Sequence, residues 1–323
     1  MTSLSGSTGP GRLPRPTTSP ASPLPQGAAG TPDRTGAWLV LAAAALWGTT
    51  GTAASLAPDG ASALAIGAAT MGLGGLFTLL LAGRAAWAVV RRGAPRWLLC
   101  GAAAIVGYPL AFYTSMSWAG VAVGTVVSIG SAPVFAALLE RCCEGLRLSR
   151  RWWLATGAAG VGCAALVFAG DGSAGGQRPA AGVALGLLAG AGYAGYSYCA
   201  ARLIGDGHGS RATMGALFGL GAVVLLPLLA LTGGGLLGSA RGLAVVGYLA
   251  VVPMCLAYLL FGAGLARVRT SAATTLSLLE PLVAALLAVL VVGERLGVLG
   301  WLGVLLVGAG LTALTTRRAA RAG

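Results

Sequence analysis

An acidic side chain, Glu280, stands directly before Pro281 in an apolar run, residues 270 to 294, that is long enough to cross a bilayer. A carboxylate near the bilayer centre costs at least ~2.5 to 3.5 kcal/mol on insertion scales, so an acid retained there indicates a functional site. Proline has no N–H, which leaves the carbonyl one turn earlier without its helical hydrogen bond. The sequence therefore predicts a charge and a helix break at one point. The alternative is a protonated glutamate that only bonds to a neighbouring helix.

Glu280 is suited to proton or amine binding. Burial favours the protonated form of a carboxyl group, whereas an approaching cationic amine favours the ionised form. If a proton and a substrate compete for this one group, antiport follows. Ser277 lies about one turn earlier on the same helix face, so we expect its hydroxyl to be part of the same site.

Several aromatic side chains lie inside apolar runs rather than only at their ends, among them Trp47, Tyr113 and Tyr258. Aromatic rings with a polar group are typical of ligand cavities, which makes these three candidate cavity residues. Anchoring at the membrane surface or ordinary packing is the alternative. The same two interpretations apply to the tyrosines of the run from 181 to 203, which are Tyr193, Tyr196 and Tyr198.

Other patterns do not point to a cofactor, a metal or catalysis. His208 lies in a glycine-rich loop without a partner cluster, and the cysteines show no CxxC spacing. The GxGxxG match at residues 190 to 195 follows no strand, so it predicts close helix packing or flexibility rather than nucleotide binding. The apolar runs hold no pair of acids and no serine with histidine. We therefore expect no cofactor, no metal and no enzyme activity; an intramembrane enzyme stays the less favoured alternative.

The composition is that of a polytopic membrane protein. The chain has 323 residues, of which 56% are hydrophobic and only 9% charged. The formal net charge is +13, yet every basic residue except one histidine is an arginine and nearly all lie between apolar runs. That distribution is typical of membrane topology and not of a nucleic-acid-binding face. We expect contact with the lipid bilayer and none with nucleic acid.

Apolar runs of about 20 residues, the length a bilayer requires, recur along the chain. Ten such runs follow a tail, residues 1 to 36, whose Ser, Thr, Pro and Gly content predicts disorder. This tail has no signal-peptide pattern. The runs are 37 to 57, 62 to 83, 97 to 118, 119 to 139, 150 to 170, 181 to 203, 211 to 232, 241 to 266, 270 to 292 and 296 to 316. A turn is required near Gly120, where two runs abut, and residues 317 to 323 form a short basic tail.

The arginines predict the orientation. If the N-terminal tail is cytoplasmic, ten crossings leave only Arg178, Arg241 and Arg295 outside. Because arginine is enriched on the cytoplasmic side of membrane proteins, both termini are expected inside the cell.

An internal repeat is visible at an offset of 148 residues, which places Pro133 on Pro281 and Trp153 on Trp301. It predicts two five-helix halves, residues 37 to 170 and 181 to 316. Since five is odd, the second half enters the membrane with inverted orientation, as in many secondary transporters. The predicted fold is an all-α integral membrane protein of ten transmembrane helices in two inverted repeats. Pro133 and Pro281 are the matched helix breakers, expected to act in gating beside a central cavity.

The chain resembles the EamA-like transporters of the drug/metabolite transporter superfamily. The resemblance rests on the two five-helix repeats together with three segments: Ala45–Thr49 (ALWGT), Leu279–Leu282 (LEPL) and Gly293–Leu296 (GERL). It implies a permease of the cytoplasmic membrane of a bacterium, commonly an exporter of amino acids, other small metabolites or toxic compounds, that works by alternating access.

Two departures limit what the resemblance implies. An arginine frequent in the second helix of the family is absent, because residues 68 to 71 are uncharged. In the first repeat Ala132 precedes Pro133, so Glu280 has no acidic counterpart.

We expect an outward, proton-linked transporter of a small organic solute. The alternatives are a facilitated uniporter without proton coupling, an intramembrane enzyme and a non-transporting membrane protein. The sequence leaves open whether the protein is a monomer or a homodimer.

Overall fold

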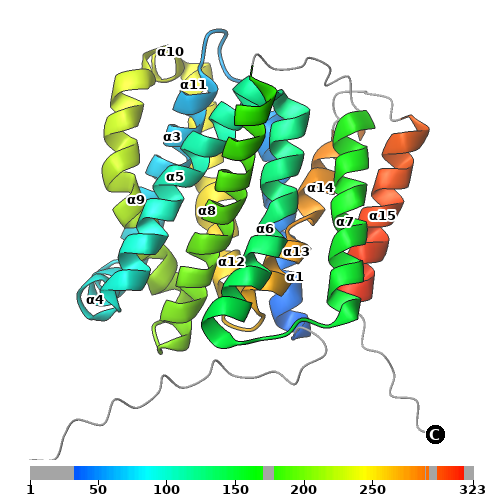
Figure 1. The fold of residues 1–323 in the computed structure, drawn as a ribbon. Coiled ribbons are helices and arrows are strands. Elements are labelled where there is room, and N and C mark those ends of the chain that lie inside the picture. Colours follow the sequence, from blue (N-terminus) through cyan, green and yellow to red (C-terminus); the bar gives the residue numbers. More distant parts are fainter. Residues whose placement is uncertain (1–32, 170–177, 288, 291–296, 316–323) are drawn as a thin grey trace, which may run out of the picture.

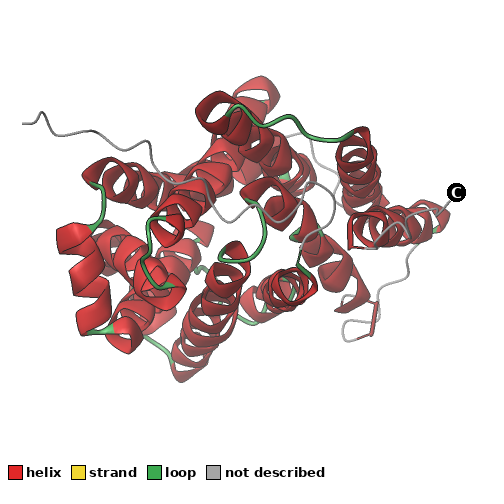
Figure 2. Ribbon diagram, turned by 90° about the horizontal axis from the view of Figure 1, so that it is seen from below, coloured by secondary structure: helices red, strands yellow, loops and turns green. Residues whose placement is uncertain are grey.

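The computed structural model describes residues 33–169, 178–287, 289–290 and 297–315. Within these ranges every regular element is a helix, and the long helices stand side by side (Figure 1). Seen from below, they pack as one bundle (Figure 2). The first helix begins at Arg34, so residues 34 to 36 belong to it rather than to the tail. The rest of the predicted N-terminal tail and the basic tail at 317 to 323 lie outside the described residues.

Each run predicted to cross the membrane contains helix. The first half holds α1 (Arg34–Trp47), α2 (Thr50–Ala54), α3 (Ala63–Ala82), α4 (Arg84–Arg92), α5 (Pro95–Ala119), α6 (Val121–Glu144) and α7 (Arg150–Ala169). The second half holds α8 (Pro179–Gly205), α9 (Ser210–Thr232), α10 (Gly234–Leu237), α11 (Ala240–Leu249), the π-helix η1 (Ala250–Leu256), α12 (Ala257–Leu265), α13 (Thr270–Leu276), α14 (Leu279–Leu287) and α15 (Val298–Thr315).

Among the described residues, eight helical segments are long and apolar enough to cross a membrane. They correspond to eight of the ten predicted runs. The other two runs are occupied by α7 and α8, helices of 20 and 27 residues in the same bundle. The count of ten crossings stays a prediction. The start of α1 and the end of α15 lie at the same end of the bundle (Figure 1), as an even number of crossings requires.

A turn separates α5 from α6, as expected. Gly120 adopts φ 93° and ψ 149°, a backbone conformation that only glycine reaches without strain. The joint apolar stretch therefore folds back as two antiparallel helices instead of one long helix.

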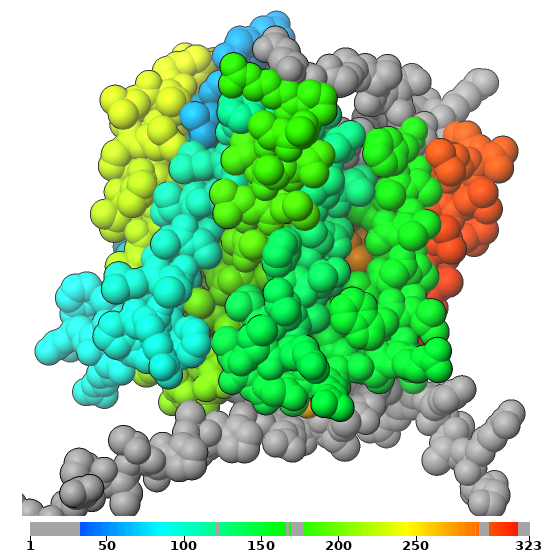
Figure 3. Space-filling view, viewed as in Figure 1, coloured from blue at the N-terminus to red at the C-terminus, as the bar shows by residue number. Residues whose placement is uncertain are grey.

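A short amphipathic helix, α4, lies between the predicted apolar runs 62 to 83 and 97 to 118, where the hydropathy pattern predicts a loop. Ala86 and Val89 are buried, while Trp87 is exposed and Arg91 points to solvent. In the space-filling view this segment projects from one side, near the end of the bundle where α1 begins (Figure 3).

Three helices that surround the centre of the bundle are interrupted or irregular. The α-helical hydrogen-bond pattern is interrupted by a turn between α1 and α2 at Gly48 and Thr49, and again between α13 and α14 at Ser277 and Leu278, about one turn before Pro281. The segment around Pro253 is a π-helix, in which each backbone hydrogen bond spans five residues instead of the four of an α-helix. Such irregular backbone at membrane depth is tolerated where it lines a cavity or is buried in protein.

The break expected at Pro133 is not found, because α6 continues through it. A proline inside a helix removes one hydrogen bond, here to the carbonyl of Ile129, and can bend a helix without ending it. Helix α8 also packs closely against this turn: a Cβ added to Gly190 would lie 2.7 Å from the carbonyl oxygen of Ser128. The two prolines matched by the repeat therefore sit in different local structures. The same contact shows the close helix packing expected of the 190 to 195 glycines.

Candidate functional site

A cavity of about 100 Å³ lies where the interrupted helices meet. Seven of its sixteen lining residues are aromatic, and one carries a carboxylate. The lining residues are Trp47, Thr50, Gly67, Thr70, Met71, Tyr108, Pro109, Phe112, Tyr113, Ile129, Tyr193, Tyr196, Pro253, Met254, Tyr258 and Glu280. Four of the predicted site residues, Trp47, Tyr113, Tyr258 and Glu280, thus come together from α1, α5, α12 and α14.

Glu280 supplies the only ionisable carboxylate of this lining. It stands in the first turn of α14, where the positive end of the helix dipole favours a negative charge. Its side chain is only partly covered, and no described residue forms a hydrogen bond or an ion pair with its carboxylate. No arginine or histidine is among the lining residues. The carboxylate thus borders the cavity without a charge partner among the described residues.

The backbone before Glu280 shows how the break is satisfied. Pro281 offers no N–H to the carbonyl of Ser277, and that carbonyl accepts instead from the N–H of Glu280 at 3.0 Å. The N–H of Leu278 donates to the carbonyl of Thr275 at 3.1 Å, which tightens the turn further. This tight turn places the carboxylate of Glu280 at the wall of the cavity.

Ser277, predicted as a site residue, is fully buried and does not line the cavity. Its hydroxyl accepts a hydrogen bond from the Tyr193 hydroxyl at 2.8 Å and donates to the carbonyl of Thr274 at 2.8 Å. Ser277 thus positions an aromatic ring of the wall, because it holds that ring from behind.

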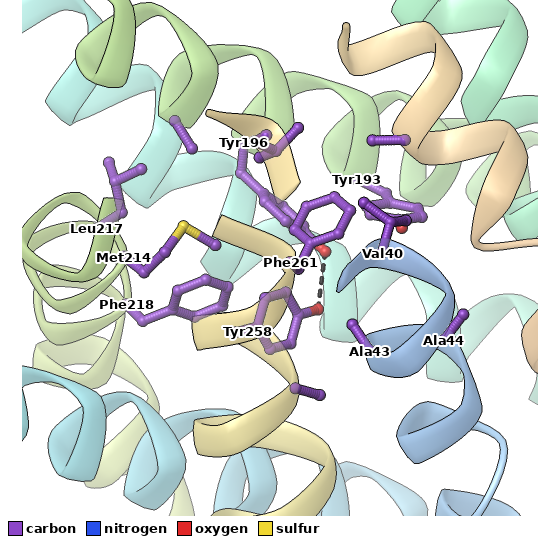
Figure 4. Close-up of a cluster of buried hydrophobic side chains, with 14 of the residues drawn as sticks. Val40, Ala43, Ala44, Tyr193, Tyr196, Met214, Leu217, Phe218, Tyr258 and Phe261 are labelled. Atoms are coloured by element: carbon purple, nitrogen blue, oxygen red, sulfur yellow. Dashed lines mark hydrogen bonds between the residues drawn. The ribbon is translucent and has the colours of Figure 1, made fainter. Parts of the chain in front are cut away.

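Trp47 is packed among aromatic rings from two other helices. Its ring centroid lies 4.9 Å from that of Tyr258, 5.2 Å from Phe261 and 6.2 Å from Tyr193. Beside it, the hydroxyls of Tyr196 and Tyr258 form a hydrogen bond of 2.8 Å, drawn as the dashed line in Figure 4. Figure 4 also shows the rings of α8 and α12 facing each other next to α1. This packing holds the rings rigidly against one another.

Helix α5 supplies the opposite part of the wall. Tyr108 stacks on Phe112 with centroids 5.6 Å apart and interplanar angle 15°, and Phe112 meets Tyr113 edge-on at 5.4 Å. The ring centroid of Tyr108 also lies 6.0 Å from that of Tyr193, so the aromatic rings of α5 are in contact with those around Trp47. A Cβ on Gly67 would overlap the Tyr113 ring, so glycine in α3 is what allows this ring to lie there.

Two sequence segments that carry the family resemblance meet at this site. A Cβ added to Gly48 would lie 2.7 Å from the Cβ of Val283 and 2.9 Å from the carbonyl oxygen of Glu280. The end of α1 therefore touches the start of α14 through a glycine, and Trp47 and Glu280 are brought to the same cavity. The Gly293–Leu296 segment lies outside the described residues.

Several lining residues escaped the sequence analysis. Thr70 and Met71 carry no charge in the sequence that would indicate a site, and Tyr108 is one of several aromatic residues in the same run as Tyr113. Pro253 and Met254 reach the cavity from the π-helix. Pro253 lies inside an apolar run, as Pro281 does, and this pattern could have indicated that Pro253 and Met254 lie at an irregular part of a helix.

A second buried acid, Glu140, was also missed. It is 3% exposed and accepts hydrogen bonds from the backbone N–H of Ser271 at 3.0 Å and from the Ser271 hydroxyl at 2.6 Å. It thereby caps the start of α13 from α6. The residue lies just past the end assigned to its apolar run, so hydropathy gave no sign that it is buried.

The remaining candidates lie apart from the cavity. The hydroxyl of Tyr198 donates to Glu144 at 2.9 Å, and Arg202 pairs with the same carboxylate at 3.3 Å. His208 lies in the turn between α8 and α9. Within the described ranges no group of three or more His, Cys, Asp or Glu is placed to hold a metal ion.

Comparison with known proteins agrees with this architecture. The model of the EamA-like transporter family matches residues 34–168 and again residues 180–316. A protein of Bacillus subtilis (strain 168) named "Uncharacterized transporter YwfM" is 38% identical over 280 residues, 85% of this chain and 92% of that protein. A crystal structure of a protein 18% identical in sequence has a TM-score of 0.74, covering 87% of this chain and 96% of its own, which shows a shared fold. The chain is therefore a multi-pass membrane protein that belongs to the EamA-like transporter family of the drug/metabolite transporter superfamily.

Proposed function

We propose that the protein is a secondary transporter that moves a small organic solute outward across the cytoplasmic membrane of a bacterium, in exchange for protons, by alternating access. The observation that carries this proposal is the position of Glu280. Its carboxylate faces a cavity at a helix interruption and has no partner among the described residues. An intramembrane acid in this setting is typical of proton and substrate pathways.

The arrangement of the cavity supports alternating access. Helices of both halves line it, and the interruptions at Gly48 and Ser277 lie beside it. In transporters built from inverted repeats, the substrate site lies between the repeats and next to such broken helices. Rigid-body movement of one half against the other then opens the site to one side of the membrane at a time.

Contacts between the halves close the space toward the end of the bundle where α1 begins. Glu140 of α6 binds Ser271 at the start of α13, and the aromatic rings of α8 and α12 pack against Trp47 of α1. These contacts must separate when the cavity opens to that side. Glu280, just beyond them, is then reached by protons and solute from one side at a time.

Proton flux tests the proposal. Purified protein in liposomes with an internal pH dye is exposed to a panel of small metabolites, and solute entry is measured in parallel. We expect a solute-triggered pH change that is lost in Glu280→Gln and kept in Asp59→Asn, which alters an exposed carboxylate. Proton-linked transport unchanged in Glu280→Gln would refute the role of Glu280. Solute movement without any pH change would identify a uniporter instead.

A further inference from the structure

We propose that the cavity binds a small organic monocation of the ammonium type, with Glu280 as its counter-ion and the surrounding aromatic faces as its cage. This assignment rests on the transport function proposed above and names the substrate class of the same site.

The lining of the cavity contains an acidic group and no basic group. Glu280 contributes a carboxylate, and none of the other lining residues is ionisable at neutral pH or basic. An ionised carboxylate removed from water is stable only when a positive charge or several donors meet it. The described residues supply neither, so the charge must be met by a proton or by a cation that enters. An anionic solute would meet a like charge and is excluded.

The aromatic rings of the cavity wall also favour a cation. Cations bind favourably over the faces of Trp and Tyr rings when they lie within about 6 Å of the ring centre, and more strongly when water is excluded. Rings from four helices surround the space: Trp47 of α1, Tyr108 and Tyr113 of α5, Tyr193 of α8, and Tyr258 of α12. Substituted ammonium groups, which cannot donate many hydrogen bonds, are the ligands that such cages recognise.

The wall also disfavours zwitterions such as free amino acids. A zwitterion would place its own carboxylate in a space that offers no positive charge, only neutral donors such as hydroxyl groups and the indole N–H of Trp47. The Tyr193 hydroxyl already donates to Ser277, and one of the hydroxyls of Tyr196 and Tyr258 donates to the other. The lining positions from α3, Thr70 and Met71, are uncharged. A solute whose carboxylate is absent or masked therefore fits better than an amino acid.

The size of the cavity limits the cation. A cavity of about 150 Å³ holds a benzene ring, so the ~100 Å³ here suits a cation of about five non-hydrogen atoms. Tetramethylammonium and tert-butylammonium have this size. tert-Butanol has the shape of the latter without its charge, and glycine is a zwitterion of similar size.

Direct binding tests the assignment without relying on transport. Titration calorimetry on the full-length protein in detergent compares tert-butylammonium, tetramethylammonium, tert-butanol and glycine. We expect both cations to bind about tenfold or more tightly than the neutral alcohol and glycine. Acidification should weaken binding of the cations and leave tert-butanol unaffected, because proton and cation compete for Glu280.

Four variants separate the contributions of the carboxylate and of the aromatic rings. Glu280→Gln should abolish the preference for tert-butylammonium over tert-butanol, while Asp59→Asn keeps it. Tyr108→Leu should weaken tetramethylammonium binding several-fold, and Tyr108→Phe should restore it, since the ring face and not the hydroxyl is needed. Circular dichroism and gel filtration verify that each variant is folded. The comparison of charged and neutral ligands needs no variant, so it stands if Glu280→Gln does not fold.

Equal affinities for tert-butylammonium and tert-butanol, tighter binding of glycine, or no saturable binding of either cation by the folded protein would each overturn the cation assignment. Those results would leave a solute-triggered pH change in liposomes untouched. Cation binding without any proton flux, in contrast, would overturn the proposed coupling and keep the ligand class.

Discussion

Replacing Glu140 with alanine should destabilise the protein by about 3 kcal/mol. The carboxylate is 3% exposed and accepts two hydrogen bonds from Ser271, at 3.0 Å from its N–H and 2.6 Å from its hydroxyl. That N–H is one of the first in α13 and has no partner within its own helix. Bonds to a charged group contribute about 1.5–3 kcal/mol each, which gives ~3–6 kcal/mol for the pair. Removing the carboxylate also relieves its own desolvation cost, which favours the lower end of that range.

The measurement is unfolding in mixed micelles of a mild detergent and increasing dodecyl sulfate, followed by circular dichroism. Glu140→Gln keeps an acceptor oxygen for the Ser271 N–H and offers an N–H that the Ser271 hydroxyl can accept. Because two neutral hydrogen bonds then replace two bonds to a carboxylate, about half the loss is expected. Asp59→Asn changes an exposed carboxylate with no hydrogen bond to a described residue and serves as the control, with a change within about 0.5 kcal/mol.

Equal stability of Glu140→Ala and the unaltered protein, within about 0.5 kcal/mol, would show that the desolvation cost of this carboxylate cancels both of its hydrogen bonds. The cap on α13 would then add nothing to stability. A Gln variant no more stable than the Ala variant would likewise refute the assignment of the effect to hydrogen bonding.

Three further predictions follow from the packing. Gly48→Ala should cost about 1–3 kcal/mol and reduce transport, because its Cβ would overlap the start of α14; the same change at Gly51, where no atom lies within 4 Å, should do neither in the same unfolding and uptake assays. Gly120→Ala should lower stability by about 1–3 kcal/mol, because its φ of 93° is strained for alanine; an unchanged thermal midpoint would count against this. Tyr196→Phe should cost about 1 kcal/mol by leaving the buried Tyr258 hydroxyl without its partner, and a double-mutant cycle with Tyr258→Phe should show coupling; additive losses would contradict it.

The sequence predicted the features that depend on local chain properties. Hydropathy located the apolar runs, and every one of them contains helix. The turn at Gly120 followed from the length of the joint run, and the break next to Pro281 followed from the missing N–H of proline. Glu280 was identifiable because a charge inside an apolar run is rare and costly. These inferences need no knowledge of what packs against what.

Contacts between distant segments decided the rest. Pro133 has the same local chemistry as Pro281, yet its helix continues. Ser277 was expected beside the substrate and instead holds Tyr193 from behind.

In the sequence, Glu140 has the position of an ordinary charge at a helix end; it is buried because the start of α13 packs beside it. Whether a side chain faces lipid, a neighbouring helix or a cavity depends on how the helices are rotated and packed. In a membrane, close contacts such as the one at Gly48, rather than hydropathy, determine this packing. The sequence thus determined that this chain forms membrane-crossing helices around an intramembrane acid, and only the tertiary structure determined which residues surround that acid.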